Sequence, residues 1–316
     1  MTLMDQKSSK NGDSAANDGG TQSPGCVHVL RRLRAVILLA GVVRSTKFNE
    51  SIQRSLLGLP LDVNTSVIGH WYNHVCQLTK VCQSNSLPLR ILVDPQSPLP
   101  VTPQLIDTTA LLIERDPLEF RGTGGVLLDS TLSYAEDDYV VVGNAAGVLL
   151  SDLSSIVSRL VDCCADITIL ANSDGSPTGL MLIRCGTLRQ ISPIGFVDLN
   201  EQALPAIAER FHVRVLRHAI ERYPVRNLSE YIQAIRQYQV SRRSGRTSDD
   251  PFAEHWLSTF SVAESSQDVA PTASLLDSVV LENGRVNDHA VLVRSIVCPG
   301  AIVPSHSTVI DEIVTS

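Results

Sequence analysis

Aromatic residues are scarce in this chain, and so are the patterns that mark several common classes of protein. Phe, Trp and Tyr make up only 4% of the 316 residues, which argues against the aromatic stacking platforms of proteins that bind single-stranded nucleic acid. The formal net charge is −7, so the sequence also lacks the broad basic footprint of a nucleic-acid-binding protein. We therefore expect no nucleic-acid partner.

Long apolar runs and metal-binding cysteine patterns are missing as well. No stretch approaches the roughly 20 apolar residues of a membrane-spanning helix, and no apolar core follows the N-terminal lysines as in a signal peptide. The seven cysteines include the adjacent Cys163 and Cys164 but form no C-x-x-C and no Cys/His cluster. Free thiols of this kind indicate a reducing compartment. We expect a cytoplasmic protein with no membrane partner.

Two polar segments divide the chain. Residues 1–30 are rich in Ser, Asn, Asp, Gly and Gln, and such a composition buries too little apolar surface to offset its ordering entropy, so we expect a disordered tail. Residues 241–275 are also polar, and Pro251 favours a short helix at residues 252–260. This second segment is predicted to be a linker.

Between these segments, short apolar runs alternate with helical patterns. The runs are rich in β-branched residues and apolar on both faces, as the strands of a covered, mainly parallel sheet must be. We expect strands at residues 35–39, 90–93, 110–113, 139–142, 167–170, 179–184 and 213–216, and helices at 65–82, 153–161, 201–211 and 229–238. The alternation predicts a doubly wound α/β domain over residues 31–240.

Residues 276–316 follow a period of six. Stepping by six gives Val279, Arg285, Val291, Val297, Val303 and Val309, and five of these six are valine. One aliphatic residue per hexad is typical of a left-handed β-helix, in which each hexad forms one face of a triangular coil, with a β-meander as the alternative. We expect about two coils, too few to stand alone, docked on the α/β domain or on another subunit.

Six stretches in chain order resemble the sugar-1-phosphate nucleotidyltransferases (NDP-sugar pyrophosphorylases), several of which end in a left-handed β-helix. The stretches are RAVILLAG at 34–41, RSLLGLPL at 54–61, FRGTGGVLLDS at 120–130, DDYVVVGNAAGVLLSDL at 137–153, GSPTGLMLIR at 175–184 and GFVDLNEQALPAIAE at 195–209. The resemblance covers residues 34–316 and implies a nucleotide-diphospho-sugar transferase-like fold. It also implies a reaction in which NTP transfers its nucleotidyl group to a sugar 1-phosphate, giving an NDP-sugar and pyrophosphate.

The resemblance also implies a set of site residues. The implied nucleotide-binding residues are Leu39, Ala40, Gly41, Gly122, Thr123 and Gly124, the sugar-binding residues are Gly179, Asp198 and Glu201, and the catalytic residues are Arg44 and Arg54. Arg54 stands where the family has a phosphate-binding lysine, and arginine keeps the charge with a different reach. The alternative for residues 122–125 is a plain glycine-rich turn. For Asp198 and Glu201 it is a helix N-terminus, which favours acids.

Several features of the family are missing here. Val42 and Val43 stand where the family has further glycines, and β-branched residues disfavour the positive φ with which a loop wraps phosphate. Ala145 or Ala146 stands at the position of one Mg²⁺-binding aspartate, and Arg226 fills the position of the second. Mg²⁺ is therefore expected only if the chain is active, and the aspartates that would bind it are absent.

Two functions remain open on the sequence alone. The first is nucleotidyl transfer, at full or weak activity, from NTP to a sugar phosphate. The second is an inactive relative that binds a nucleotide or an NDP-sugar as a sensor, or as a regulatory or scaffold subunit. An unrelated α/β protein is the third interpretation. For the first two we expect a homo-oligomer that associates through the exposed β-helix.

Overall fold

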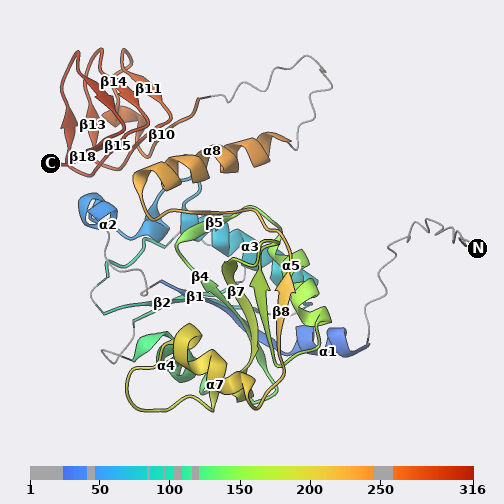
Figure 1. Cartoon of the computed structure of the whole chain (residues 1–316). Coiled ribbons are helices and arrows are strands. Elements are labelled where there is room, and N and C mark those ends of the chain that lie inside the picture. The colour runs from blue at the N-terminus through green and yellow to red at the C-terminus, as the bar shows by residue number, and fades with distance from the viewer. Residues whose placement is uncertain are drawn as a thin grey trace, which may run out of the picture.

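The computed structural model describes residues 24–40, 47–83, 86–95, 97–102, 109–115, 121–244 and 259–316. Figure 1 shows an α/β domain with helices on both faces of its sheet, and a C-terminal β-helix next to helix α8. Residues 1–23 of the expected tail and residues 251–258 of the expected linker helix lie outside the described residues.

A seven-stranded sheet forms the centre of the α/β domain. Its strand order is β3-β2-β1-β4-β7-β6-β8, and β7 runs antiparallel to both of its neighbours while the other pairs are parallel. The strands are β1 (Leu33–Leu39), β2 (Leu89–Val93), β3 (Leu111–Arg115), β4 (Tyr139–Asn144), β6 (Ile167–Ala171), β7 (Pro177–Arg184) and β8 (Val213–Arg217). All seven predicted strands and the mainly parallel sheet are confirmed.

Helices cover the two faces of this sheet. On one face lie α3 (Val67–Val81), α5 (Leu153–Asp162) and α8 (Leu228–Ser244), and on the other lie α4 (Gly122–Thr131), η2 (Leu199–Ala203) and α7 (Leu204–Ala208). The alternation along β1 explains the two layers, since Val36 and Leu38 enter one core while Ala35 and Ile37 enter the other. No helix in the described part of the chain is long and apolar enough to cross a membrane.

The structure corrects two boundaries and adds several small elements. Helix α1 (Pro24–Arg31) packs Leu30 into the core, so the expectation of disorder up to residue 30 is wrong at its C-terminal end. Helix α8 continues past residue 238 to Ser244. The remaining elements are α2 (Lys47–Ile52), η1 (Leu56–Gly58), α6 (Cys185–Leu188) and the antiparallel pair β5 (Gly147–Leu149) and β9 (Arg222–Pro224), which the sequence did not predict.

The C-terminal segment folds into a β-helix of three parallel sheets. Their orders are β10-β12-β15-β18, β11-β14-β17 and β13-β16. The strands are β10 (Ser261–Ala263), β11 (Ser274–Leu276), β12 (Ser278–Val280), β13 (Arg285–Val286), β14 (Val291–Val293), β15 (Ile296–Val297), β16 (Ile302–Val303), β17 (Thr308–Ile310) and β18 (Ile313–Val314), with a short turn η3 (Ser266–Asp268). The β-helix is confirmed, but it begins at residue 261 instead of 276, and four stacked strands give it more than the two coils expected.

The strict six-residue period is wrong at the end of each coil. Residues stacked on neighbouring coils, such as Ser278 and Ser295, are 17 positions apart, so Val279 pairs with Ile296 and not with Val297. The interior columns are Ala263, Val280, Val297 and Val314, then Val269, Val286 and Val303, then Leu275, Leu292 and Val309. Along the chain these residues recur at steps of six, six and five, because one residue is dropped in every coil.

The β-helix docks on the α/β domain of its own chain. The outer face of its four-stranded sheet joins the main core through Val262, Val279, Leu281 and Ile296. This confirms docking on the α/β domain, one of the two alternatives expected. Self-association through the β-helix stays a prediction.

Candidate functional site

The carboxyl ends of the parallel strands meet at one edge of the central sheet. β1 ends at Leu39, β4 at Asn144 and β6 at Ala171, and the antiparallel strand β7 begins at the same edge with Pro177. In open α/β sheets, ligands bind in the crevice outside these strand ends. This edge is therefore where the fold fits a ligand best.

A pocket of about 280 Å³ opens at this edge. Polar side chains from β4, β6, β7 and the segment after β8 line it, among them Asn144, Asn172, Thr178, Arg222 and Arg226. Gly179, predicted to approach a sugar, lies beside the pocket. Its φ is +78°, and a Cβ at this position would lie 3.4 Å from the Cβ of Asn144.

The position of Arg222 is set by the pairing of β5 with β9. Its Nη2 donates a hydrogen bond to the backbone oxygen of Asn144 at 3.0 Å. A Cβ on Gly147 would lie 2.8 Å from that nitrogen, so a larger residue there would force the guanidinium to shift. Within the described residues the Nε of Arg222 is buried and has no hydrogen-bond partner. Burial lowers the pKa of Arg222, and the charge of Arg226 lowers it further.

Arg226 is held in a different way. Its Nη2 lies 2.8 Å from Oε1 of Glu230, one turn into α8, and its Nε lies 3.2 Å from Oε2. These hydrogen bonds to the carboxylate raise the pKa of Arg226. The side chain of Arg226 is 58% exposed, so it forms the rim of the pocket while Arg222 forms the inner wall.

The described residues of this pocket do not fit Mg²⁺. That ion prefers carboxylate and carbonyl oxygens in an octahedral arrangement, but no Asp or Glu lies among the described residues that line the pocket. Ala146 lines it, and Ala145 is buried next to the end of β1. Nowhere in the described part of the chain do three or more His, Cys, Asp or Glu side chains form a group that could hold a metal ion.

The glycines predicted to receive a base begin a helix, so the alternative of a plain glycine-rich turn is wrong. Gly122 opens α4 with a φ of +69°, and a Cβ there would lie 2.5 Å from the backbone oxygen of Val197. Gly124 donates its backbone N–H to the same oxygen at 2.9 Å. These two glycines allow α4 and the segment before η2 to approach each other closely.

Thr123 and Asp198, predicted on the base side and the sugar side, contact each other. The hydroxyl of Thr123 donates to Oδ2 of Asp198 at 3.1 Å and accepts from the N–H of Leu199 at 2.7 Å. Oδ1 of Asp198 accepts the N–H groups of Asn200 and Glu201. Asp198 is thus the N-cap of η2, the alternative role foreseen for it, and the side chain of Glu201 is exposed.

The predicted phosphate-binding residues are only partly described. Gly41 and Arg44 lie outside the described residues. Leu39 and Ala40 end β1, with the oxygen of Leu39 accepting the N–H of Ala145 at 3.1 Å. Arg54 turns to the β-helix, where its Nη1 pairs with Oε2 of Glu264 at 2.7 Å. Its partner places Arg54 in the contact between the two parts of the chain.

Replacing Arg54 with Met is expected to loosen the β-helix from the α/β domain. The side chains of Arg54 and Glu264 are 20% and 22% exposed, and Glu264 also accepts the N–H of Glu282. Losing a half-buried pair of this kind should lower the free energy of unfolding by about 1 to 2 kcal/mol. Hydrogen exchange should rise along β10 and β12. The matched control is Arg294→Met, which removes an exposed pair with Asp311 and should change little.

A different result would restore Arg54 to the phosphate site. If Arg54→Met keeps its stability and its slow exchange in β10 and β12 but loses affinity for a nucleotide, the contact with Glu264 is incidental. Arg54 would then act on the ligand, as the sequence implied.

Sequence reasoning missed the residue that dominates the pocket. Arg222 belongs to a three-residue strand, β9, whose partner β5 is equally short, and such strands carry no periodic pattern to detect. One signal was available in the sequence. Arg222 and Arg226 stand four residues apart on either side of Tyr223, Pro224 and Val225, with no acid before Glu230.

Comparisons with known proteins give only distant matches. No protein-family model matches the sequence, and no curated protein matches it. HddC from Yersinia pseudotuberculosis matches in structure with a TM-score of 0.43 and 12% identity, over 65% of this chain and 99% of that chain. A putative glucose-1-phosphate thymidylyltransferase from Bacillus anthracis, in complex with a sucrose, matches with a TM-score of 0.48 and 12% identity, over 66% of this chain and 95% of that chain.

Proposed function

We propose that this chain binds a nucleotide or a sugar nucleotide at the carboxyl edge of its sheet and acts as a sensor, or as a regulatory or scaffold subunit, without nucleotidyl transfer. The observation that carries the proposal is the pocket beside Asn144. Two arginines line it, and no carboxylate is found among its described lining residues. Such a lining attracts a polyanion but offers no carboxylate to a divalent cation.

Transfer to a sugar 1-phosphate demands more than attraction. Two polyanions must be brought together, and charge develops on the reacting phosphoryl group. A divalent cation supplies Lewis-acid stabilisation worth several kcal/mol in such reactions. Because no carboxylate that could hold that cation is found among the described residues of the pocket, the arginines can hold a phosphate group but supply only part of this stabilisation. Binding without turnover is the function that this geometry supports best.

Calorimetry with a panel of nucleoside di- and triphosphates and NDP-sugars, each with and without Mg²⁺, tests the proposal. We expect binding of at least one of these ligands with an affinity that does not depend on Mg²⁺. A pyrophosphate-release assay with NTP, Mg²⁺ and a panel of hexose 1-phosphates should give no signal above background. Mg²⁺-dependent binding together with pyrophosphate release would establish the transferase instead, and no binding of any nucleotide would overturn the proposal.

A further inference from the structure

We propose that the pocket lined by Asn144, Thr178, Arg222 and Arg226 is a phosphate-binding subsite in which arginines do the work that a metal ion does in other phosphate sites. The inference deepens the proposed function, because it rests on the same edge of the sheet and names the group that is recognised. Its substrate class is a sugar phosphate or another small phosphomonoester, bound through its phosphate.

The first argument is that the buried guanidinium of Arg222 has few partners among the described residues. Its guanidinium makes one hydrogen bond within the described residues, from Nη2 to the oxygen of Asn144. Its Nε is buried without a partner, and no ion pair to Arg222 is found in the described part of the chain. A buried charge without a counter-ion is costly. A bound anion would supply the missing counter-ion, so the pocket gains by being occupied.

The second argument is the balance of donors and acceptors. Oδ1 of Asn144 is engaged by the N–H of Ala146 at 2.8 Å, which leaves the amide Nδ2 as the group available to a ligand. Thr178 already donates its hydroxyl to the oxygen of Leu170 at 2.7 Å. Asn172 differs, because its Nδ2 donates to the hydroxyl of Ser176 at 3.0 Å. The other polar groups, from Asn144, Arg222 and Arg226, offer N–H donors, and a phosphate group offers three oxygens that only accept.

The third argument is the charge around the pocket. Arg226 is partly neutralised by Glu230, whereas Arg222 has no acidic partner in the described residues, so the pair keeps a net positive charge. A planar guanidinium can bind phosphate through two parallel hydrogen bonds. The polar side chain of Asn172 and the small Ala146 and Pro177 complete the lining, which leaves room beside the phosphate for a polar body such as a sugar.

The experiment measures binding by calorimetry in Mg²⁺-free buffer with EDTA, using the full chain. The probes are inorganic phosphate, a hexose 1-phosphate, the parent hexose and a nucleoside diphosphate. We expect the phosphate-bearing probes to bind and the parent hexose not to bind. Arg222→Met should weaken hexose 1-phosphate binding by about 10-fold to 100-fold, as the loss of a charge-assisted hydrogen bond predicts.

Three further variants extend the binding test, and one of them is a control. Arg222→Lys retains the positive charge but loses the paired N–H donors of the guanidinium, and it should weaken binding by about 10-fold. This variant replaces Arg222→Met in the test if Arg222→Met does not fold. Glu230→Gln removes the acid next to Arg226 and should tighten binding by about two-fold to five-fold. Arg285→Met, on the exposed surface of the β-helix, is the matched control and should bind like the unmodified chain.

The outcomes separate this inference from the proposed function. Binding of phosphate and hexose 1-phosphate that depends on Arg222, with no nucleotide bound, would support the subsite and remove the nucleotide function. Nucleotide binding that is unchanged in Arg222→Met and Arg222→Lys, with no affinity for phosphate, would overturn the subsite alone. Phosphate binding that appears only when Mg²⁺ is added would also overturn it.

Discussion

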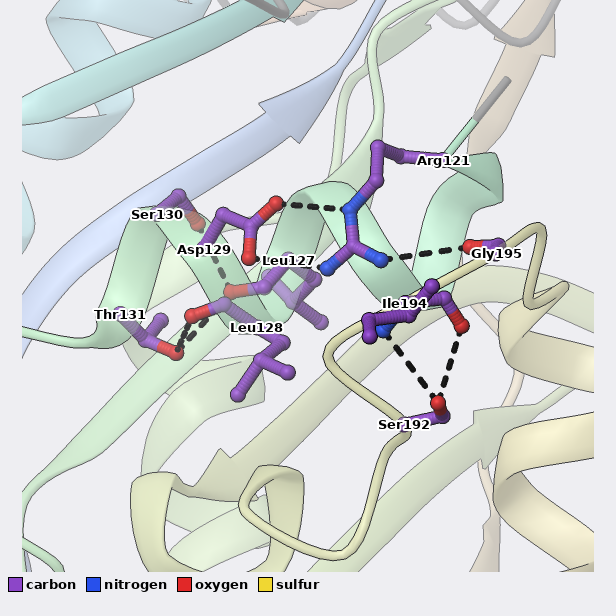
Figure 2. A network of polar contacts seen from close by, with 9 residues as sticks. All are labelled: Arg121, Leu127, Leu128, Asp129, Ser130, Thr131, Ser192, Ile194 and Gly195. Atoms are coloured by element: carbon purple, nitrogen blue, oxygen red, sulfur yellow. Dashed lines mark hydrogen bonds and ion pairs between the residues drawn. The ribbon is translucent and has the colours of Figure 1, made fainter. Parts of the chain in front are cut away.

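Replacing Arg121 with Met is expected to lower the free energy of unfolding by about 2 to 4 kcal/mol, the largest effect of any single substitution considered for this chain. The side chain of Arg121 is only 5% exposed. Its Nε and Nη2 each lie 2.9 Å from an oxygen of Asp129, and its Nη1 donates to the oxygen of Gly195 (Figure 2). The substitution leaves the carboxylate of Asp129 and that carbonyl without this partner.

Urea unfolding of matched variants measures the effect. Asp129→Leu should also destabilise the chain, because it removes the carboxylate that pairs with the buried guanidinium. The double variant Arg121→Met/Asp129→Leu should lose less than the sum of the two single variants, since neither charge is then left alone. If the two single losses simply add, the pair is not coupled and this account of Arg121 is wrong.

Arg121 also helps to hold residues 192–197, the segment before η2, in place. Ile194 and Phe196 are 83% and 60% exposed, so their burial contributes little to holding this segment. The contacts that hold it include the one from Arg121 to Gly195, the backbone contacts of Val197 with Arg121 and Gly124, and the packing of the Val197 side chain against the core. Hydrogen exchange in residues 192–197 should therefore rise more in Arg121→Met than in Asp129→Leu, which keeps the arginine.

Lowering the pH from 6.5 to 4 is expected to destabilise the fold by about 2 to 3 kcal/mol through His70. Burial, helped by the charge of His74, lowers the pKa of His70 from 6.5 to about 4. Its Nε2 and that of His74 lie 2.6 and 2.8 Å from the same oxygen, that of Leu149. Two neutral rings can share this oxygen in the core between α3 and β5, but two imidazolium ions repel each other there.

The sign follows from where each state binds protons. The unfolded chain protonates His70 near pH 6.5, whereas the folded chain does so only near pH 4. The stabilising contribution is therefore fully present above pH 6.5 and is lost as the pH falls towards 4. Burial lowers the pKa of His74 too, so His74 acts in the same direction.

Unfolding free energies measured between pH 7 and pH 4 test this prediction. His70→Gln keeps a donor for the oxygen of Leu149 and should flatten the pH dependence. His28→Gln, at an exposed position of α1, should leave the dependence unchanged. An identical slope in His70→Gln and in the unmodified chain would show that the acid sensitivity has another origin.

The strands were predictable because their signal is local. Six of the seven residues of β1 are aliphatic, and β4 contains three consecutive valines. A sheet covered on both faces requires such apolar runs. Helix α4 was not predictable in the same way. Its first turn contains Gly122, Gly124 and Gly125, which disfavour a helix on propensity alone. The helix forms because Val197 packs against the space that these glycines leave open.

The candidate site depended on tertiary pairing, and the sequence alone did not reveal it. Gly179 follows Thr178, which lines the pocket, and its role at a sugar stays a prediction. Asp198 caps η2, which is the alternative role expected for it. Arg222 reaches the pocket only because β5 and β9 pair across more than 70 residues of chain, as its contact with Asn144 shows. The period of the β-helix was read nearly correctly, since six is the step on two faces of the coil and five is the step on the third.

Each coil of the β-helix is one residue shorter than three full hexads. The β-helix can therefore change its length only by whole coils. Corner residues such as Asn283, His289 and Arg294 adopt left-handed backbone conformations at steps that repeat with the coil. An insertion of one residue within a strand would turn the later side chains of that strand from the inside to the outside. An insertion or deletion of one whole repeat of 17 would instead keep the later side chains in their own columns. Natural variation in the length of this β-helix should therefore occur in whole coils, and the face that contacts the α/β domain should stay unchanged.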